Sequence, residues 1–121
     1  MEGEGVHEMK KITLCGSTRF MDLYHEANLK LTLAGHLVYS VATSVKGDFE
    51  PTMEEKCKLD IVHLMKIDAS DTILVITDKS GYVGESTTRE IIYARARGKM
   101  VYYLNSHGDR LGLVPGWDSM P

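Results

Sequence analysis

TILVIT, residues 72–77, is a short run without a charged side chain that follows Ser70-Asp71 in the middle of the chain. Its apolar side chains occupy consecutive positions, which is typical of a strand that is covered on both faces. Both faces are covered when helices pack on each side of a parallel sheet. We therefore expect residues 72–77 to form the central strand of an α/β fold.

Three more strands and three helices are expected on either side of this run, from turn signals and from the spacing of apolar residues. The strands are expected at residues 11–15, 37–42 and 100–104, and the helices at residues 20–34, 52–68 and 86–97. Strands that alternate with helices predict a parallel sheet with right-handed crossovers. The expected fold is a flavodoxin-like or Rossmann-like three-layer sandwich with strand order 2-1-3-4, with or without a short fifth strand at residues 111–114.

Length and composition predict a single domain over residues 1–121, with residues 1–9 flexible. A net charge of −3 and a pI near 5.9 lack the basic field that holds nucleic acid polymers. No apolar run is long enough for a membrane span, and the acidic, polar start does not resemble a signal peptide. These features predict a cytoplasmic protein that binds small molecules.

Cysteine and histidine spacing gives no metal-ligand pattern. Cys15 lies in an expected buried strand and is far from Cys57 in the sequence, so both are expected to be free thiols. The five histidines are scattered, and a lone helical histidine such as His63 is more often structural than catalytic. We therefore expect neither a bound metal nor a cofactor.

Two loops, residues 16–19 and 78–90, follow strands at the edge where such folds bind ligands. Gly16-Ser17-Thr18-Arg19 joins backbone N–H groups at a helix start with two hydroxyls and a guanidinium, which suits a small phosphate. The same residues also make an ordinary strand-to-helix turn with a serine cap. The tetrapeptide alone favours this simpler interpretation.

The second loop leads to two glutamates with different expected roles. If Thr87 is the N-cap, Glu90 completes a capping box and only closes the helix start. However, Glu90 precedes apolar residues beside the expected cleft, where the position and pKa of a carboxylate can both be controlled. Glu85 is expected to lie in the loop and to be more solvated. The pattern favours Glu90 as the reactive group and leaves the capping alternative open.

Several fragments stand in a fixed order along residues 10–104. They are CGSTR at 15–19, SD at 70–71, a glycine-containing loop, and EIIYARARGK at 90–99. In this order they resemble the nucleoside 2-deoxyribosyltransferase superfamily, which includes the 2'-deoxynucleoside 5'-monophosphate N-glycosidases. The frame E-x-x-x-A-x-x-x-x-K is the most specific piece of the resemblance.

The resemblance implies cleavage of the N-glycosidic bond of a nucleoside or its 5'-monophosphate, either by hydrolysis or by transfer to a second base. Glu90 matches the glutamate that attacks C1' and forms a covalent sugar intermediate. Asp78 and His63 complete the implied catalytic set, and family dimers imply a homodimer or a higher homo-oligomer. The implied substrate-binding residues are Gly16, Ser17, Thr18, Arg19, Gly81, Gly84, Glu85, Ser86 and Thr87.

Two positions depart from the family pattern. His63 stands where family members usually have an acidic residue, and Thr13 stands where they often have a tyrosine near the sugar. Two functions therefore stay open. One is an N-glycosidase or deoxyribosyltransferase, and the other is a catalytically silent nucleotide-binding module of the same fold.

Overall fold

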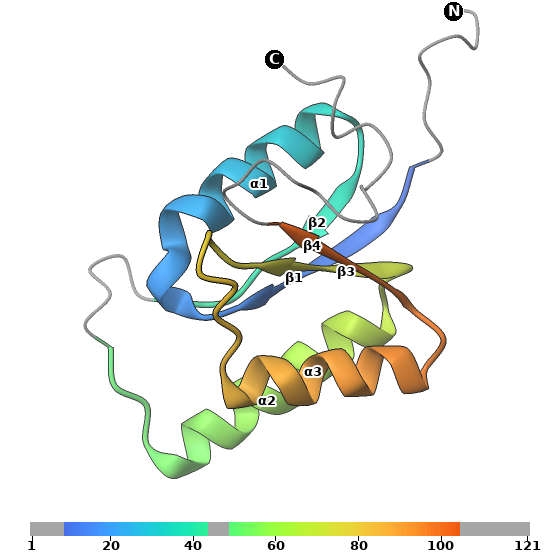
Figure 1. Cartoon of the computed structure of the whole chain (residues 1–121). Coiled ribbons are helices and arrows are strands. Elements are labelled where there is room, and N and C mark those ends of the chain that lie inside the picture. The colour runs from blue at the N-terminus through green and yellow to red at the C-terminus, as the bar shows by residue number, and fades with distance from the viewer. Residues whose placement is uncertain (1–8, 44–48, 105–121) are drawn as a thin grey trace, which may run out of the picture.

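The computed structural model describes residues 9–43 and 49–104, which form a four-stranded parallel sheet between two helical layers (Figure 1). The strands are β1 (Lys11–Gly16), β2 (Leu37–Tyr39), β3 (Thr72–Ile76) and β4 (Met100–Leu104). Their order in the sheet is β2-β1-β3-β4. The predicted flavodoxin-like α/β fold and its strand order are confirmed. The optional fifth strand at residues 111–114 and most of the flexible start lie outside the described residues.

The central strand is β3, as its sequence predicts. Every residue of β3 is buried. It pairs in parallel with β1 on one side and with β4 on the other, so neither of its edges is free. Its burial on both faces explains why apolar side chains occupy consecutive positions there.

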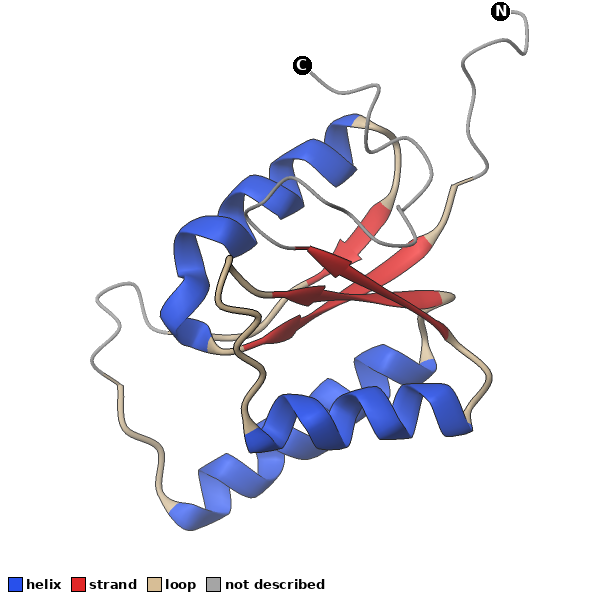
Figure 2. Ribbon diagram, in the orientation of Figure 1, coloured by secondary structure: helices blue, strands red, loops and turns tan. Residues whose placement is uncertain are grey.

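One face of the sheet is covered by α1 (Met21–Leu33), which follows a short 3-10 helix (Thr18–Phe20). Figure 2 shows α1 on this side of the sheet and α2 and α3 on the other. Buried α1 residues one turn apart pack against alternate residues of β1 and β3. This core contains Ile12, Leu14, Tyr24, Ala27, Leu31, Leu74 and Ile76.

The opposite face is covered by α2 (Met53–Asp68) and α3 (Glu85–Ala96). The strand residues on this face are the neighbours of those that face α1, because successive side chains of a strand point to opposite sides. The second core contains Cys15, Ile67, Ile73, Val75, Ile91 and Ala94. Cys15 therefore lies on the side of the sheet that carries α2 and α3.

The helix starts show which capping predictions hold. The capping box between Thr52 and Glu55 is confirmed, with both reciprocal hydrogen bonds present at the start of α2. Helix α3 begins earlier than expected, with Gly84 as its N-cap, so Glu85 is its first residue and not a loop residue. Thr87 consequently lies inside the first turn of α3. The alternative in which Thr87 is the N-cap and forms a capping box with Glu90 is therefore wrong.

Within residues 9–43 and 49–104, no helix combines the length and the hydrophobicity needed to cross a membrane.

The predicted second strand is shorter than expected, because β2 ends at Tyr39 instead of residue 42.

The ends of β1 and β3 approach each other closely at Gly16. Gly16 is paired with Ile76 and has a φ of +152°. A Cβ atom at this position would lie 2.5 Å from the Ile76 carbonyl oxygen, which is closer than the two atoms can pack. The hydroxyl of Tyr24 donates a hydrogen bond of 2.8 Å to the Gly16 carbonyl and holds the turn from the α1 side. The strand end therefore requires glycine.

Replacing Gly16 by alanine is expected to lower the free energy of unfolding by about 2–5 kcal/mol, because overpacking adds to the cost of a positive φ. Gly98→Ala is the matched control, since Gly98 has a φ of +76° and nothing within 4 Å of the added Cβ. It should cost only about 1–2 kcal/mol. Urea unfolding curves of the two variants measure the difference. Equal losses would contradict the close contact.

Candidate active site

Three reactive side chains meet on the α2–α3 side of the sheet, one each from β1, α2 and α3. The Cys15 Sγ atom lies 3.3 Å from His63 Nε2, and the same nitrogen lies 3.6 Å from Glu90 Oε1. One donor atom from each residue lies within 4.8 Å of the other two. We call these residues the Cys15–His63–Glu90 cluster. The cluster brings together His63 and Glu90, which the sequence analysis assigned to the catalytic set.

The local sequence explains how each side chain reaches the cluster. Cys15 alternates with Leu14, which faces α1, so the thiol faces α2 and α3. His63 and Ile67 are the buried residues of α2 and are four positions apart, which places both on the face toward the sheet. Glu90 precedes the buried Ile91 in the second turn of α3. The cluster is thus built by regular elements and not by loops.

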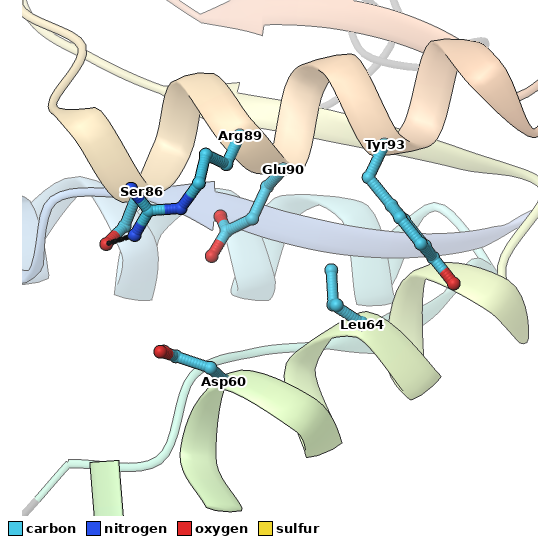
Figure 3. A pocket seen from close by; sticks show the side chains of 6 residues that line it. All are labelled: Asp60, Leu64, Ser86, Arg89, Glu90 and Tyr93. Carbon is cyan, nitrogen blue, oxygen red and sulfur yellow. Dashed lines mark hydrogen bonds between the residues drawn. The ribbon is translucent and has the colours of Figure 1, made fainter. Parts of the chain in front are cut away.

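Glu90 also borders a cavity between α2 and α3. The cavity has a volume of about 210 Å³. It is lined by Asp60, Leu64, Ser86, Arg89, Glu90 and Tyr93 (Figure 3). Figure 3 shows the Glu90 carboxylate pointing down from α3 into the space above α2. Small-molecule pockets usually measure roughly 300–1,000 Å³, so this cavity suits one part of a ligand, such as a sugar ring.

Burial has the largest effect on the ionisation of Glu90. It raises the pKa of Glu90 from its ordinary value of 4.5 to about 7. A hydrogen bond with Cys15 lowers the pKa of Glu90, the Asp60 charge raises it, and Arg89 lowers it. Near neutral pH the carboxyl therefore exists in both its protonated and its ionised form. This is the range in which a carboxyl group serves well in acid, base or nucleophilic chemistry.

The same burial acts on the other two members of the cluster. Burial and the nearby Lys66 lower the pKa of His63 to about 4, although Asp60 opposes them. The imidazole is therefore neutral at pH 7. Burial, together with the charge and hydrogen bond of Glu90, raises the pKa of the Cys15 thiol well above its usual range. Cys15 is therefore protonated and is a poor nucleophile itself.

The Gly16–Arg19 turn lies at the end of β1 and contacts the second predicted loop. Ser17 caps the 3-10 helix, since its hydroxyl accepts a hydrogen bond of 3.2 Å from the Arg19 N–H. The Arg19 guanidinium stacks over the Tyr82 ring at 4.1 Å from its centroid. The Phe20 ring meets the same tyrosine edge-on, with centroids 6.4 Å apart. The turn and the loop before α3 are therefore held together by aromatic contacts.

Asp78 begins the loop that follows β3 and interacts with the loop itself. Its carboxylate accepts hydrogen bonds from the Ser80 N–H at 2.9 Å and from the Ser80 hydroxyl at 2.5 Å. These two bonds lower the pKa of Asp78. Gly81 then adopts a positive φ of 72°, and Gly84 caps α3. Asp78 thus stabilises the loop in this structure and is not part of the Cys15–His63–Glu90 cluster.

Predicted site residues fall into two groups in the structure. His63, Glu90 and Ser86 lie at the cluster or its cavity. The other predicted residues belong to the two loops or to the start of α3 and do not line this cavity. They are Gly16, Ser17, Thr18, Arg19, Asp78, Gly81, Gly84, Glu85 and Thr87. Thr87 is buried inside α3, and Glu85 is exposed at its first position.

Several site residues were missed by the sequence analysis. Cys15 was noted only as a buried thiol. Two signals could have identified it as a site residue. It lies just before the carboxyl end of β1, and strand alternation places it on the face opposite Leu14. The other four border the cavity. They are Asp60, Leu64, Arg89 and Tyr93. Three of them lie outside the quoted fragments, and Tyr93 lies within the fragment at residues 90–99 but was given no role.

Comparisons with known proteins identify the fold. No family model matches the chain, and no curated protein matches it either. A 2-deoxyribosyltransferase from Bacillus psychrosaccharolyticus superposes with a TM-score of 0.65 at 20% identity, covering 91% of this chain and 82% of that one. A 2-deoxyribosyltransferase from Leishmania mexicana gives a TM-score of 0.56 at 17% identity. That match covers 79% of this chain and 64% of the Leishmania chain.

The chain therefore has the fold of the 2-deoxyribosyltransferases. At these identities the likeness concerns the backbone arrangement, and it agrees with the resemblance that the sequence fragments carry. The Bacillus protein is described as a suitable biocatalyst for the synthesis of nucleosides.

We expect the free energy of unfolding of Glu90→Gln to increase relative to that of the parent as the pH rises from 4 to 8. The folded parent retains a proton on Glu90 up to a pH of about 7, whereas the unfolded chain releases it near 4.5, so parent stability falls across this range. Glutamine never ionises. The difference in the free energy of unfolding between the variant and the parent should widen by about 3 kcal/mol, at 1.36 kcal/mol per pKa unit.

Urea unfolding at several pH values measures this gap. His63 is present in both proteins, so the difference isolates Glu90. The exposed Glu85 on the same helix provides the matched control, and Glu85→Gln should show no comparable widening. A constant gap for Glu90→Gln would show that burial does not hold the proton on Glu90.

Proposed function

We propose that the protein cleaves the N-glycosidic bond of a nucleoside or a nucleoside 5'-monophosphate, with Glu90 as the nucleophile. The observation that carries this proposal is the Glu90 carboxyl, half-buried beside a cavity and with a pKa near 7. The supporting context is a fold shared with two 2-deoxyribosyltransferases. Glu90 is also the residue that matches the glutamate of the family frame.

The proposed reaction has two displacements at C1' of the sugar. The ionised Glu90 carboxylate forms a bond to C1' while the bond to the base breaks, and the base leaves with the electron pair and takes up a proton. A water molecule or a second base then attacks C1' and loses a proton, which balances the proton taken up by the first base, and the bond from C1' to Glu90 breaks to release the carboxylate. Water as the acceptor gives hydrolysis, whereas a second base gives transfer.

In this proposal, His63 holds the Glu90 carboxylate in position and does not act as an acid. Its Nε2 atom lies 3.6 Å from the Glu90 carboxylate, and its pKa near 4 keeps it neutral at pH 7. A neutral imidazole does not neutralise the carboxylate, so Glu90 keeps its negative charge for attack. A cationic partner at the same distance would lower its nucleophilicity.

Asp78 is proposed to assist the departing base. It lies at the carboxyl end of β3, the edge of the sheet where ligands bind in parallel α/β folds. To act on a base it has to exchange its two hydrogen bonds with Ser80 for contacts to the ligand. Ser80 and Gly81 lie in a turn, which can rearrange more easily than a strand.

The decisive test compares Glu90→Gln with Glu85→Gln in one assay for free base, using a panel of nucleosides and their 5'-monophosphates. Glutamine keeps the shape of glutamate but cannot attack C1', so product formation by Glu90→Gln should fall about 10³-fold or more. Glu85→Gln should stay near the parent because Glu85 is exposed at the helix start. A larger loss at Glu85 would show that the wrong glutamate is assigned.

A second candidate function is a catalytically silent nucleotide-binding module. His63 favours it, because a neutral histidine occupies a position that is usually acidic in the family that the sequence resembles. The same panel separates the two functions. Ligand binding without release of base by the parent protein would establish the silent module.

Phosphate recognition is proposed at the Gly16–Arg19 turn, with Ser86 at the start of α3. Thr87 was also predicted there, but it is buried inside α3 and would support the helix start without contacting the phosphate. Arg19→Ala should weaken binding of a 5'-monophosphate by about 1.5–3 kcal/mol, the scale of a charged hydrogen bond, and leave a bare nucleoside nearly unaffected. Isothermal titration calorimetry measures both. Equal losses for both ligands would contradict the assignment.

Arg97→Ala is the matched control for this measurement. Arg97 also stacks on an aromatic ring, that of Tyr93, at 4.6 Å, but it lies at the far end of α3. Because Arg97 packs on Tyr93 of the cavity, any effect of its loss should be equal for monophosphate and nucleoside. This control separates a phosphate contact from the general loss of an arginine.

A homo-oligomer stays a prediction. Ile61, Val62 and Met65 are exposed on α2, at positions that share one side of the helix, and a second copy of the chain would be expected to pack there.

A further inference from the structure

The Cys15–His63–Glu90 cluster combines three different metal-ligating groups on one side of the sheet. A thiol, an imidazole and a carboxyl are the side chains that bind Zn²⁺ in proteins. Sequence spacing does not reveal this set, because its members come from three separate elements, β1, α2 and α3. The expectation of no metal site depended on spacing alone.

We propose that the Cys15–His63–Glu90 cluster binds a divalent cation of the Zn²⁺ type. The distances support this assignment. In a tetrahedral site with bonds of about 2.0–2.3 Å, neighbouring ligand atoms lie roughly 3.3–3.7 Å apart. The cluster has 3.3 Å between Cys15 Sγ and His63 Nε2, and 3.6 Å between that nitrogen and Glu90 Oε1.

The third distance, between the donor atoms of Cys15 and Glu90, depends on the position of the Glu90 side chain. The donor atoms of Cys15 and Glu90 lie within 4.8 Å of each other. Cys15 is fixed in a strand and His63 is buried, whereas the Glu90 side chain is 17% exposed and borders the cavity. A small rotation of Glu90 therefore completes the set. The cavity beside Glu90 would leave room for a water molecule as the fourth ligand.

Charge balance favours a divalent cation in this buried place. On binding, the Cys15 thiol releases its proton to solvent and becomes a thiolate. An ionised Glu90 adds a second negative charge, and the imidazole of His63 would bind the cation in its neutral form. Two anionic ligands around a divalent cation give a net charge of zero. A neutral assembly is the form that a buried site tolerates best.

Metal binding would inhibit the reaction proposed above, and this consequence rests on the proposed function. The cation holds the same carboxylate that is proposed to attack C1'. A free Glu90 and a metal-bound Glu90 are therefore alternative states of one site. The protein would be active without metal and silent with it.

Co²⁺ titration of the metal-free full chain tests the site directly. A cobalt–thiolate bond gives a charge-transfer absorption in the near ultraviolet, and tetrahedral coordination gives intense visible bands. Both should appear with one equivalent of Co²⁺ and disappear when Zn²⁺ is added. Cys15→Ser, His63→Gln and Glu90→Gln should each weaken Co²⁺ binding by roughly tenfold or more, since even indirect contacts to a metal contribute that much.

Cys57→Ser is the matched control because Cys57 is the second, exposed cysteine on α2. It should keep the full spectrum and affinity. Loss of the thiolate band in Cys57→Ser, or equal binding by the parent and Glu90→Gln, would overturn the proposed site. Circular dichroism checks folding. If Cys15→Ser fails to fold, His63→Gln and Glu90→Gln decide the result.

A nucleoside cleavage assay separates this proposal from the proposed function. Zn²⁺ should abolish release of base, and a chelator should restore it. Metal-free protein without any activity would reject the proposed function and leave the Co²⁺ result intact. Full activity with bound Zn²⁺ would overturn the inhibitory role.

Discussion

The close approach of β1 and β3 at Gly16 is the constraint on which the rest of the site depends. Only a residue without a side chain fits against the Ile76 carbonyl there. The approach lets the two strands pair along their full length and end at the same level. Strand alternation turns Cys15, the residue before Gly16, toward α2 and α3, and the turn that follows Gly16 reaches the loop after β3. The reactive cluster and the predicted phosphate turn thus both start from one glycine.

Burial determines the chemistry of the cluster. The same desolvation moves the pKa values of Glu90 and His63 in opposite directions, because the charged form of one is an anion and that of the other is a cation. Both groups become neutral more readily than they would in water. The cost is stability: above pH 7 the fold must hold a carboxylate beside an apolar helix face. A group with this cost is more easily explained by function than by folding.

The structure divides the candidate site residues between two places. The cavity between α2 and α3 holds the Glu90 carboxyl, whereas the Arg19 turn and its Tyr82 contact lie at the carboxyl ends of β1 and β3. A nucleotide has two chemically different parts to place, a sugar near the nucleophile and a phosphate near a cation. The cavity is large enough for the sugar alone. Under the proposed function, the cavity would take the sugar and the Arg19 turn would take the phosphate of one substrate.

The sequence by itself determined the sheet and its order. The unbroken apolar run of β3 required burial on both faces, and alternation with amphipathic helices required parallel crossovers. Local signals were also sufficient for the capping box at Thr52, because its partners lie three residues apart. The start of α3 was misjudged by one residue, since Gly84 caps it through its backbone and Thr87 only imitates a cap.

Only the tertiary structure decided which side chains meet. Cys15, His63 and Glu90 are 48 and 27 positions apart in the chain, and no spacing rule connects them. They meet because strand alternation turns Cys15 toward α2 and α3, and because both helices pack on that face. Their pKa values follow from this shared burial and not from residue type. Local interactions act over a few residues, whereas burial and contact between distant elements exist only once the sheet has formed.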